Sequence, residues 1–163
     1  SGLLVVAKTP MARSSLIDQL QKRMMTREYT AVASGIIEKN GFIEEPIGRH
    51  PIHRTRMCVS KKGKDAITHY NPIESGLDWT LLNCKLETGR THQIRVHLTH
   101  IGHPLIGDHL YKSRRTRFDF HRQALHASRL VCNHPVLNKK MCWEISIPTD
   151  MEELLKGLRD NRS

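Results

Sequence analysis

Apolar and polar residues alternate along much of this chain, and the alternation predicts short strands with one buried face. In the segment 79–87, Leu82, Cys84 and Leu86 recur at every second position, so they share one side of the expected strand. The predicted strands span Leu3–Ala7, Tyr29–Ile37, Phe42–Ile47, Met57–Ser60, Ala66–Ile73, Trp79–Glu87, Leu125–Cys132 and Met141–Ile147. In the last strand, the alternating apolar residues are Met141, Trp143, Ile145 and Ile147.

Other segments have the period of a helix. Thr9-Pro10 supplies an N-cap and a proline for the first helical position, which opens a helix that runs to about Met24. Leu16, Leu20 and Met24 would share its buried face. A closing helix is predicted over Met151–Leu158.

A further helix is predicted in the middle of the chain. Ile94, Leu98 and Ile101 recur at i, i+4 and i+7, so they can face a core together. Thr91 is the expected N-cap and Gly102 the expected stop, which gives a helix of about three turns.

Turn signals between the strands indicate the fold class. Asn40-Gly41 predicts a hairpin between the strands on either side, and the Gly-containing segment 61–64 predicts a second one. The segment 49–56 has little periodicity and is expected to be a loop. Because strands outnumber helices and tight turns join several of them, the sequence predicts an α+β domain with a mostly antiparallel sheet over residues 1–163.

Positive charge is concentrated in two parts of the chain. The chain has 26 Lys and Arg against 16 Asp and Glu, a formal net charge of +10. Ten of the cations form two clusters: Arg49, Arg54, Arg56, Lys61, Lys62 and Lys64, and then Lys112, Arg114, Arg115 and Arg117. Such concentration is typical of a surface that binds a polyanion, and it predicts a nucleic-acid partner.

The cysteines and the apolar runs bear on the cellular setting. Cys58, Cys84, Cys132 and Cys142 contain no C-x-x-C pair, and Cys84 and Cys142 lie in patterned strands, where a free Cys acts as a small core residue. These features predict a reduced, cytoplasmic protein. No apolar run approaches the roughly 20 residues of a membrane span, so no membrane association is expected.

Several motifs, in order along the chain, carry a resemblance to a known family. The longest is Glu87-Thr88-Gly89-Arg90-Thr91-His92-Gln93-Ile94-Arg95-Val96-His97-Leu98, followed by Gly102–Asp108 and Tyr111. The shorter ones are Ser1–Lys8, Arg27–Val32, the residues Arg56-Met57, Val59, Gly63-Lys64, Ala66, Thr68 and Tyr70, and Leu125-His126-Ala127. Together they resemble the RluA-type pseudouridine synthases, which isomerise uridine within RNA.

The resemblance implies a mixed sheet flanked by helices and an active site in a central cleft. It implies that Arg95 pairs with a catalytic Asp, and that Tyr29 stacks on the flipped uracil and serves as general acid or base. The family has its nucleophilic Asp in a His-Arg-Leu-Asp motif a few residues before Ser1, so the chain is expected to be a catalytic domain that is incomplete at its N-terminus. Asp108 is not expected to replace it, because the family has a second, structural Asp at that position.

Outside the reacting centre, the predicted RNA-binding residues are Arg90, His92, Arg54, Arg56, Lys61 and Lys62. Arg90 and His92 would act at the rim of the active site, and the remaining cations would contact the RNA backbone. Each of these side chains, like Arg95 and Tyr29, has an ordinary alternative in a surface ion pair, a local hydrogen bond or core packing.

Histidines raise the question of a metal. His97, His100 and His103 are spaced three residues apart, whereas helical zinc sites favour i, i+4 pairs. No Cys pair or acidic residue with ligand spacing accompanies them, so no metal is predicted. The isomerisation requires no metal or redox cofactor either.

The sequence therefore predicts an RNA pseudouridine synthase, with ribosomal RNA favoured over transfer RNA as substrate. The resemblance also allows an N-terminal RNA-binding domain of the S4 type in a longer polypeptide. The alternatives are a noncatalytic RNA-binding module on the same fold and, far behind, a metal-dependent hydrolase built on the histidines. Without the Asp motif, residues 1–163 alone are expected to bind RNA weakly and to form no pseudouridine.

Overall fold

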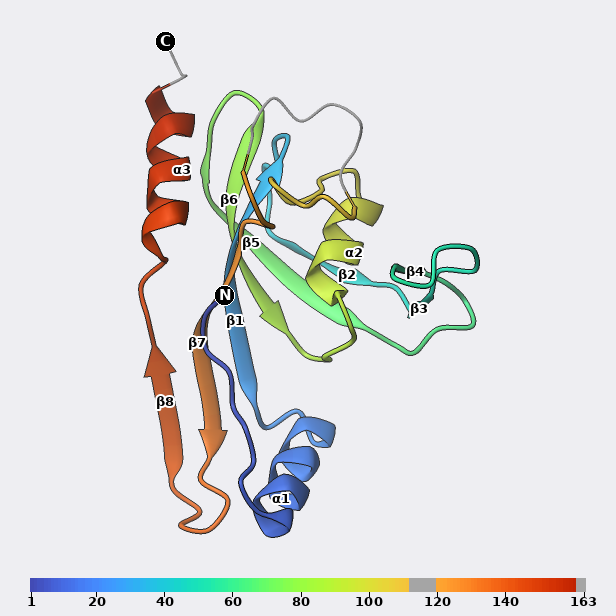
Figure 1. Ribbon diagram of the computed structural model, residues 1–163, viewed down its shortest axis with the longest axis vertical. Helices are drawn as coiled ribbons and strands as arrows, with labels where there is room; N and C mark the ends of the chain where they lie inside the picture. Colours follow the sequence, from blue (N-terminus) through green and yellow to red (C-terminus); the bar gives the residue numbers. More distant parts are fainter. Residues whose placement is uncertain (112–119, 161–163) are drawn as a thin grey trace.

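The computed structural model describes residues 1–111 and 120–160, which are built around a six-stranded sheet (Figure 1). The elements are α1 (Pro10–Gln21), β1 (Thr26–Ser34), β2 (Gly41–Glu44), β3 (Ile47–Arg49), β4 (Met57–Val59), β5 (Ile67–Ser75), β6 (Trp79–Leu86), α2 (Gln93–His100), β7 (Leu125–Asn133), β8 (Lys140–Glu144) and α3 (Thr149–Asp160). The large sheet has the order β2-β5-β6-β1-β7-β8, and β3 and β4 form a separate two-stranded ribbon. All these strand pairs are antiparallel, so the predicted α+β class is confirmed.

One core lies between the sheet and α2. Leu82, Cys84 and Leu86 of β6 are buried on this face, as the alternation predicts. Ile94 and Leu98 of α2 pack against them, so the helical stripe predicted in the middle of the chain is confirmed. This packing fixes the rotation of α2 and therefore the directions of its remaining side chains.

A second core lies on the opposite face of the sheet. Trp79 and Leu81 belong to β6 as well, but their side chains point to the other side because strand residues alternate. Met151, Leu155 and Leu158 of α3 cover them, which confirms the predicted closing helix. Figure 1 shows α2 and α3 on the two sides of the sheet.

The predicted helix caps have different outcomes. Thr9 is the N-cap of α1, and its Oγ1 accepts from the Ala12 N–H at 3.2 Å. Thr91 is not the cap of α2, since His92 takes that place in the left-handed region with φ 57°. Gly102, with φ 87°, follows the end of the helix as predicted. None of the helices in the described ranges is both long and apolar enough to span a membrane.

The buried face of α1 differs from the prediction. The helix ends at Gln21, and Leu20 and Met24 are 39% and 51% exposed. Leu16 is buried as predicted, and the second buried residue is Gln19. Gln19 Nε2 donates to the Asn133 carbonyl at 2.9 Å, and its Oε1 accepts from the Asn133 N–H at 2.7 Å. These two hydrogen bonds to Asn133, at the end of β7, thus fix the position of α1 against the sheet.

Both predicted hairpins are wrong in their partners. β2 pairs with β5 and not with β1, and β4 pairs with β3 and not with β5. After β1, the Gly35 N–H donates to the Asp78 carbonyl and the Ile37 N–H donates to Thr80 Oγ1. These bonds carry the chain across the end of β6, so β2 forms at the far edge of the sheet. The predicted loop after Arg49 is confirmed and joins β3 to β4.

The patterned segments at the two ends of the chain are less buried than predicted. Leu3–Ala7 forms no strand, and Leu4 and Val6 are 83% and 70% exposed. The parallel contact there is a single bridge from Gly2 to Ala127. β8 is an edge strand, which explains why Trp143 remains 40% exposed despite the clean alternation around it.

The four cysteines are free thiols. Cys84 is buried, as expected for a small core residue, and Cys132 is buried too. Cys142 is exposed on the edge strand β8, so its predicted place in a core is wrong. Cys58 is partly buried on β4.

Candidate active site

A cavity of about 300 Å³ lies between β1, the start of α2 and the start of β7. It is lined by Tyr29, Leu86, Arg90, His92, Gln93, Ile94, Arg95, Gln123 and Leu125. Four residues proposed from the sequence, Tyr29, Arg90, His92 and Arg95, are thereby brought to one place. They come from a central strand and from the loop and helix that follow β6, so the antiparallel order of the sheet assembles the cavity.

Arg95 is held by a buried carboxylate. Its Nε donates to Asp108 Oδ2 at 2.7 Å and its Nη2 donates to Asp108 Oδ1 at 2.8 Å. The Asp108 side chain is 0% exposed and the Arg95 side chain 13% exposed. This two-point contact fixes the plane of the guanidinium. Nη1 has no hydrogen-bond partner among the described residues, so it is the guanidinium nitrogen that remains able to donate to a ligand in the cavity.

Asp108 is saturated with hydrogen bonds. Besides the two from Arg95, its Oδ1 accepts from the Leu110 and Tyr111 N–H groups at 3.0 and 3.1 Å. Burial by itself would raise the pKa of Asp108, but the guanidinium and these two N–H groups outweigh burial and keep the pKa below the ordinary value. A carboxylate held in this way is an anchor for Arg95 and for the loop that contains Tyr111. The sequence predicts a structural role for Asp108 but pairs Arg95 with a different, catalytic Asp; among the described residues the partner of Arg95 is Asp108.

His92 links the cavity to Tyr111. The Tyr111 hydroxyl accepts from the Met57 N–H at 2.8 Å and lies 2.8 Å from His92 Nδ1. The pKa of His92 is lowered, chiefly by burial and next by the charge of Arg95, so the ring is neutral near pH 7. We assign the Tyr111 hydroxyl as donor to Nδ1, because that arrangement uses its proton and leaves the His92 Nε2–H as a donor.

Gln93 organises the turn before α2, a role the sequence reasoning missed. It is only 3% exposed, and its Oε1 accepts from Thr88 Oγ1 and from the Arg90 N–H at 2.8 and 2.9 Å. Its Nε2 donates to the Ile67 carbonyl and to Thr68 Oγ1, both at 3.0 Å. The one signal in the sequence is a polar amide directly before an apolar helical stripe. This network sets the backbone path that carries Arg90 to the cavity.

Tyr29 lies on the strand β1, which is paired on both sides. Burial raises its pKa, and the neighbouring Arg27 opposes the rise only in part, so the hydroxyl keeps its proton near neutral pH. The register shifts between Glu28 and Tyr29 in the pairing with β7. A shift of this kind redirects a side chain from its regular position.

The predicted RNA-binding cations divide between separate hollows. A groove of about 620 Å³ is lined by Arg54, Lys62 and Arg90, together with Arg49 and Lys64. None of these five cations is in an ion pair with the described part of the chain. The groove therefore combines several uncompensated positive charges, which is the property that a phosphate backbone requires.

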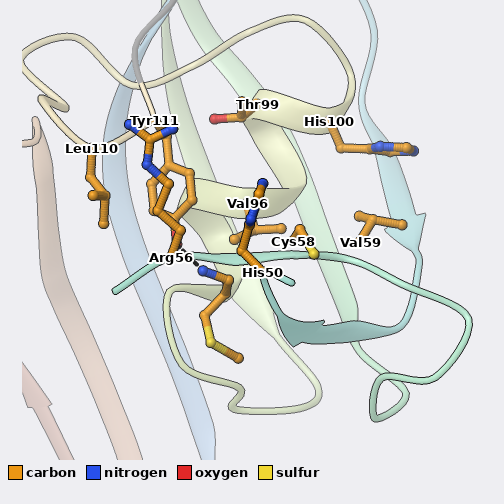
Figure 2. Close-up of a pocket in the computed structure, with 10 residues that line it drawn as sticks. His50, Arg56, Cys58, Val59, Val96, Thr99, His100, Leu110 and Tyr111 are labelled. Atoms are coloured by element: carbon orange, nitrogen blue, oxygen red, sulfur yellow. Dashed lines mark hydrogen bonds between the residues drawn. The ribbon is translucent and has the colours of Figure 1, made fainter. Parts of the chain in front are cut away.

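The remaining predicted cations lie elsewhere. Arg56 lines another pocket together with Tyr111 (Figure 2). Lys61 is exposed and lines neither the groove nor the cavities described here. The second basic cluster, Lys112, Arg114, Arg115 and Arg117, lies outside the described residues.

The histidines considered as metal ligands have other partners. His97 Nε2 donates to the Glu45 carbonyl at 2.9 Å, so Nδ1 accepts from Thr68 Oγ1, also at 2.9 Å. His103 Nδ1 donates to the Ser34 carbonyl at 2.9 Å, whereas His100 is exposed. Within residues 1–111 and 120–160, no three His, Cys, Asp or Glu side chains are grouped so that they could hold a metal ion.

Comparison with known proteins relates this arrangement to one family. Residues 1–100 match the family described as RNA pseudouridylate synthase. The chain is 47% identical to the Ribosomal large subunit pseudouridine synthase D of Pasteurella multocida, over 98% of this chain and 53% of that protein. It is 49% identical to the Uncharacterized RNA pseudouridine synthase YlyB of Bacillus subtilis, over 99% of this chain and 53% of that protein. The chain thus spans about half the length of these relatives.

Solved structures show the same architecture. Human RNA Pseudouridylate Synthase Domain Containing 1 superposes with a TM-score of 0.73 at 27% identity, over 94% of this chain and 74% of that one. Human RNA Pseudouridylate Synthase Domain Containing 4 superposes with a TM-score of 0.74 at 20% identity, over 93% of this chain and 69% of that one. At the lower identity the likeness concerns the fold alone.

Proposed function

Because the chain belongs to the RNA pseudouridylate synthase family, we propose that the protein isomerises specific uridines to pseudouridine in RNA, with ribosomal RNA favoured over transfer RNA. The observation that carries the proposal is the cavity that joins Tyr29 to Arg95. The relatives named for the ribosomal large subunit support the choice of RNA.

Arg95 is assigned the electrostatic part of the reaction. Asp108 holds two of its nitrogens, so the third can bind a carboxylate near the sugar without any loss of orientation. A guanidinium in this place keeps such a carboxylate ionised despite burial, which a nucleophile at the anomeric carbon requires.

Tyr29 is assigned the binding of the uracil base and the transfer of its proton. The Tyr29 ring and the apolar Leu86, Ile94 and Leu125 line one part of the cavity, so a base that has left the RNA stack finds an aromatic and apolar surface there, beside the polar residues of the site. Since the raised pKa keeps the hydroxyl protonated, it can first donate a hydrogen bond to the base. Once the new bond to C5 of the uracil has formed, the same hydroxyl can take the C5 proton and give its own proton to N1, so that the net transfer is from C5 to N1.

The family's nucleophilic Asp would have to reach this cavity from residues upstream of Ser1, and the position of the amino end supports that assignment. The Ser1 nitrogen lies 3.3 Å from the Leu125 carbonyl oxygen, and Leu125 lines the cavity. The Ala127 N–H also donates to the Ser1 carbonyl at 2.9 Å. The amino end is thereby held against β7, beside β1 (Figure 1). A preceding segment would emerge at the rim of the cavity.

The basic groove is assigned to the RNA backbone. Arg90 lines both the groove and the catalytic cavity, so the two hollows are neighbours that share this residue. Arg54 and Lys62 extend the positive charge away from the reacting centre. His92 is assigned to the rim, where its Nε2–H can donate to the flipped nucleotide. Cytoplasmic action and an additional RNA-binding domain of the S4 type in the longer protein are part of the same proposal.

The test compares three proteins: residues 1–163, a version extended upstream through the Asp motif, and that version with Arg95→Ala. Pseudouridine is measured by chemical labelling and mass spectrometry, without added metal or nucleotide. The extended protein should convert uridine, whereas residues 1–163 should bind RNA and form no product. Arg95→Ala should abolish turnover and leave RNA affinity within about threefold, since its contacts are at the reacting centre and not along the backbone path.

Arg54→Gln is the matched control, because it should weaken RNA binding and leave the single-turnover rate at saturating RNA unchanged. Near-normal conversion by the Arg95 variant would refute its role. Inactivity of the extended protein on all cellular RNAs, with binding retained, would favour the second candidate. That candidate is a noncatalytic RNA-binding module. The observation in its favour is that the charged residues lining the basic groove are all positive.

A further inference from the structure

A second pocket, of about 330 Å³, is lined by Tyr111 and is distinct from the catalytic cavity (Figure 2 shows its lining residues). Its apolar part is formed by Val59 of β4, Val96 of α2 and Leu110. Arg56 also lines it, and its volume is in the range of small-molecule binding sites. From the sequence, Arg56 is predicted to contact the RNA backbone, and the pocket beside it forms only in the tertiary structure.

The two hollows are separate but share their wall. α2 turns Arg95 toward the catalytic cavity and the next residue, Val96, toward the second pocket. Arg95 lies over the Tyr111 ring, 4.9 Å from its centroid, and the ring itself lines the second pocket. The Tyr111 hydroxyl also binds His92, which lines the catalytic cavity. Whatever fills the second pocket therefore contacts the residue on which Arg95 rests.

The polar groups of the pocket are donors without an acidic partner. His50 Nδ1 accepts from the Ile52 and His53 N–H groups at 3.2 and 3.1 Å, so the neutral ring carries its proton on Nε2. Arg56 is in no ion pair with any described residue. Figure 2 shows Arg56 beside Tyr111 on one side of the pocket and His100 on the other.

An apolar floor, an aromatic wall and a rim of cationic and N–H donors together match a nucleotide. The base would lie on the apolar side chains beside Tyr111, and the phosphate would bind Arg56. We propose that this pocket binds an unpaired nucleotide of the RNA substrate other than the uridine that reacts. The proposal rests on the proposed function, since it assumes that the chain binds RNA. A base bound in this pocket would contact Tyr111, and Tyr111 in turn contacts Arg95, so the bound base would help to hold Arg95 in place.

The pocket contains its own chemical reporter. Cys58 lines it and is partly accessible, whereas Cys84 and Cys132 are buried. Cys142 is exposed on β8, at the far edge of the large sheet from the β3–β4 ribbon, and serves as an internal control. The rates at which N-ethylmaleimide labels Cys58 and Cys142 are followed by peptide mass spectrometry in the full chain.

The probes are a short single-stranded RNA of mixed sequence, uridine and adenosine 5′-monophosphates, and inorganic phosphate. Binding of the RNA is measured independently by fluorescence anisotropy. At an RNA concentration about ten times the Kd, labelling of Cys58 should slow about tenfold by mass action, and labelling of Cys142 should not change. The monophosphates should protect Cys58 at higher concentration, and phosphate alone should not.

Two variants sharpen the result. Arg56→Gln should remove the protection by monophosphates, whereas Arg54→Gln, which changes a groove residue of the same loop, should leave it intact. RNA binding by anisotropy with Cys58 as reactive as in the free chain would overturn the inference and leave the proposed function standing. Equal protection by phosphate would overturn the assignment of a nucleotide. Absence of any RNA binding would overturn the proposed function itself.

Discussion

Replacing Asp108 by Asn tests whether this carboxylate is the anchor of the site. The side chain keeps its size and shape and loses its charge. Asn can still accept from the Leu110 and Tyr111 N–H groups, but its amide nitrogen cannot accept from Arg95. One of the two guanidinium bonds is therefore lost, and the positive charge of Arg95 loses its counter-ion.

The expected cost follows from the burial of the pair. Asp108 is 0% exposed and Arg95 13% exposed, so little water can replace the lost contact. Removing one partner of a buried ion pair costs roughly 3–5 kcal/mol, and the slight exposure of Arg95 places this pair near 3 kcal/mol. The exposed pair Lys22–Asp18, with side chains 62% and 53% exposed, is the matched control. Asp18→Asn should cost less than about 0.5 kcal/mol.

Urea unfolding of residues 1–163, followed by the fluorescence of the two Trp residues, measures both variants. Because the pKa of Asp108 is lowered in the folded chain, its contribution is complete above the ordinary value of 3.8 and is lost as the pH falls through the lower folded pKa. The difference from wild type should stay constant between about pH 8 and pH 5. A loss below about 1 kcal/mol, or a difference that vanishes by pH 5, would refute the anchoring role.

Three further predictions concern other parts of the chain. Arg54→Gln and Lys62→Gln should each reduce the slope of the logarithm of RNA affinity against the logarithm of salt by about 0.7, and an unchanged slope would place the RNA path elsewhere. Burial lowers the pKa of His97 below its ordinary 6.5, so the unfolded chain gains a proton first as the pH falls below 6.5, and the free energy of unfolding should decline there. Urea titrations at successive pH values should show a shallower decline for His97→Asn, and an equal slope would contradict this reasoning. Gly102→Ala meets no atom within 4 Å and should cost only the left-handed strain of about 1–2 kcal/mol. Gly107→Ala adds a Cβ 2.1 Å from the Arg122 carbonyl oxygen and should destabilise the chain markedly more in the same assay.

The sequence predicted elements well wherever their own residues decide the structure. The α3 stripe of Met151, Leu155 and Leu158 is such a case, since one face of a helix packs on one face of a sheet. Strand partners were predicted poorly, because Asn40-Gly41 signals a turn without saying which strand the chain will meet. Trp143 is more exposed than its alternating pattern predicts. The alternation shows which residues share a face of the strand, but it does not show that β8 lies at the edge of the sheet.

Prediction of the site had a different basis. Arg95 and Tyr29 were selected by their resemblance to family motifs, and the cavity that joins them is consistent with that choice. The support around them was not predictable, because it depends on contacts between distant segments. Gln93 bonds to β5, and Tyr111 bonds to the first residue of β4, so neither role exists until the tertiary structure forms.

The separation of the large sheet from the β3–β4 ribbon has a consequence for amide hydrogen exchange. β1 is paired along both sides, and Ala31, Val32 and Ala33 are fully buried, so their amides should exchange only when the whole domain unfolds. The ribbon has only three residues in each strand and, in the described part of the chain, no ladder with the large sheet. It is held by one bridge between Ile47 and Lys64 and by the Tyr111 hydroxyl, which accepts from the Met57 N–H. Its amides can therefore exchange through local opening. The ribbon, with the adjacent Arg56 and Lys62, can open locally while the strand that carries Tyr29 stays closed.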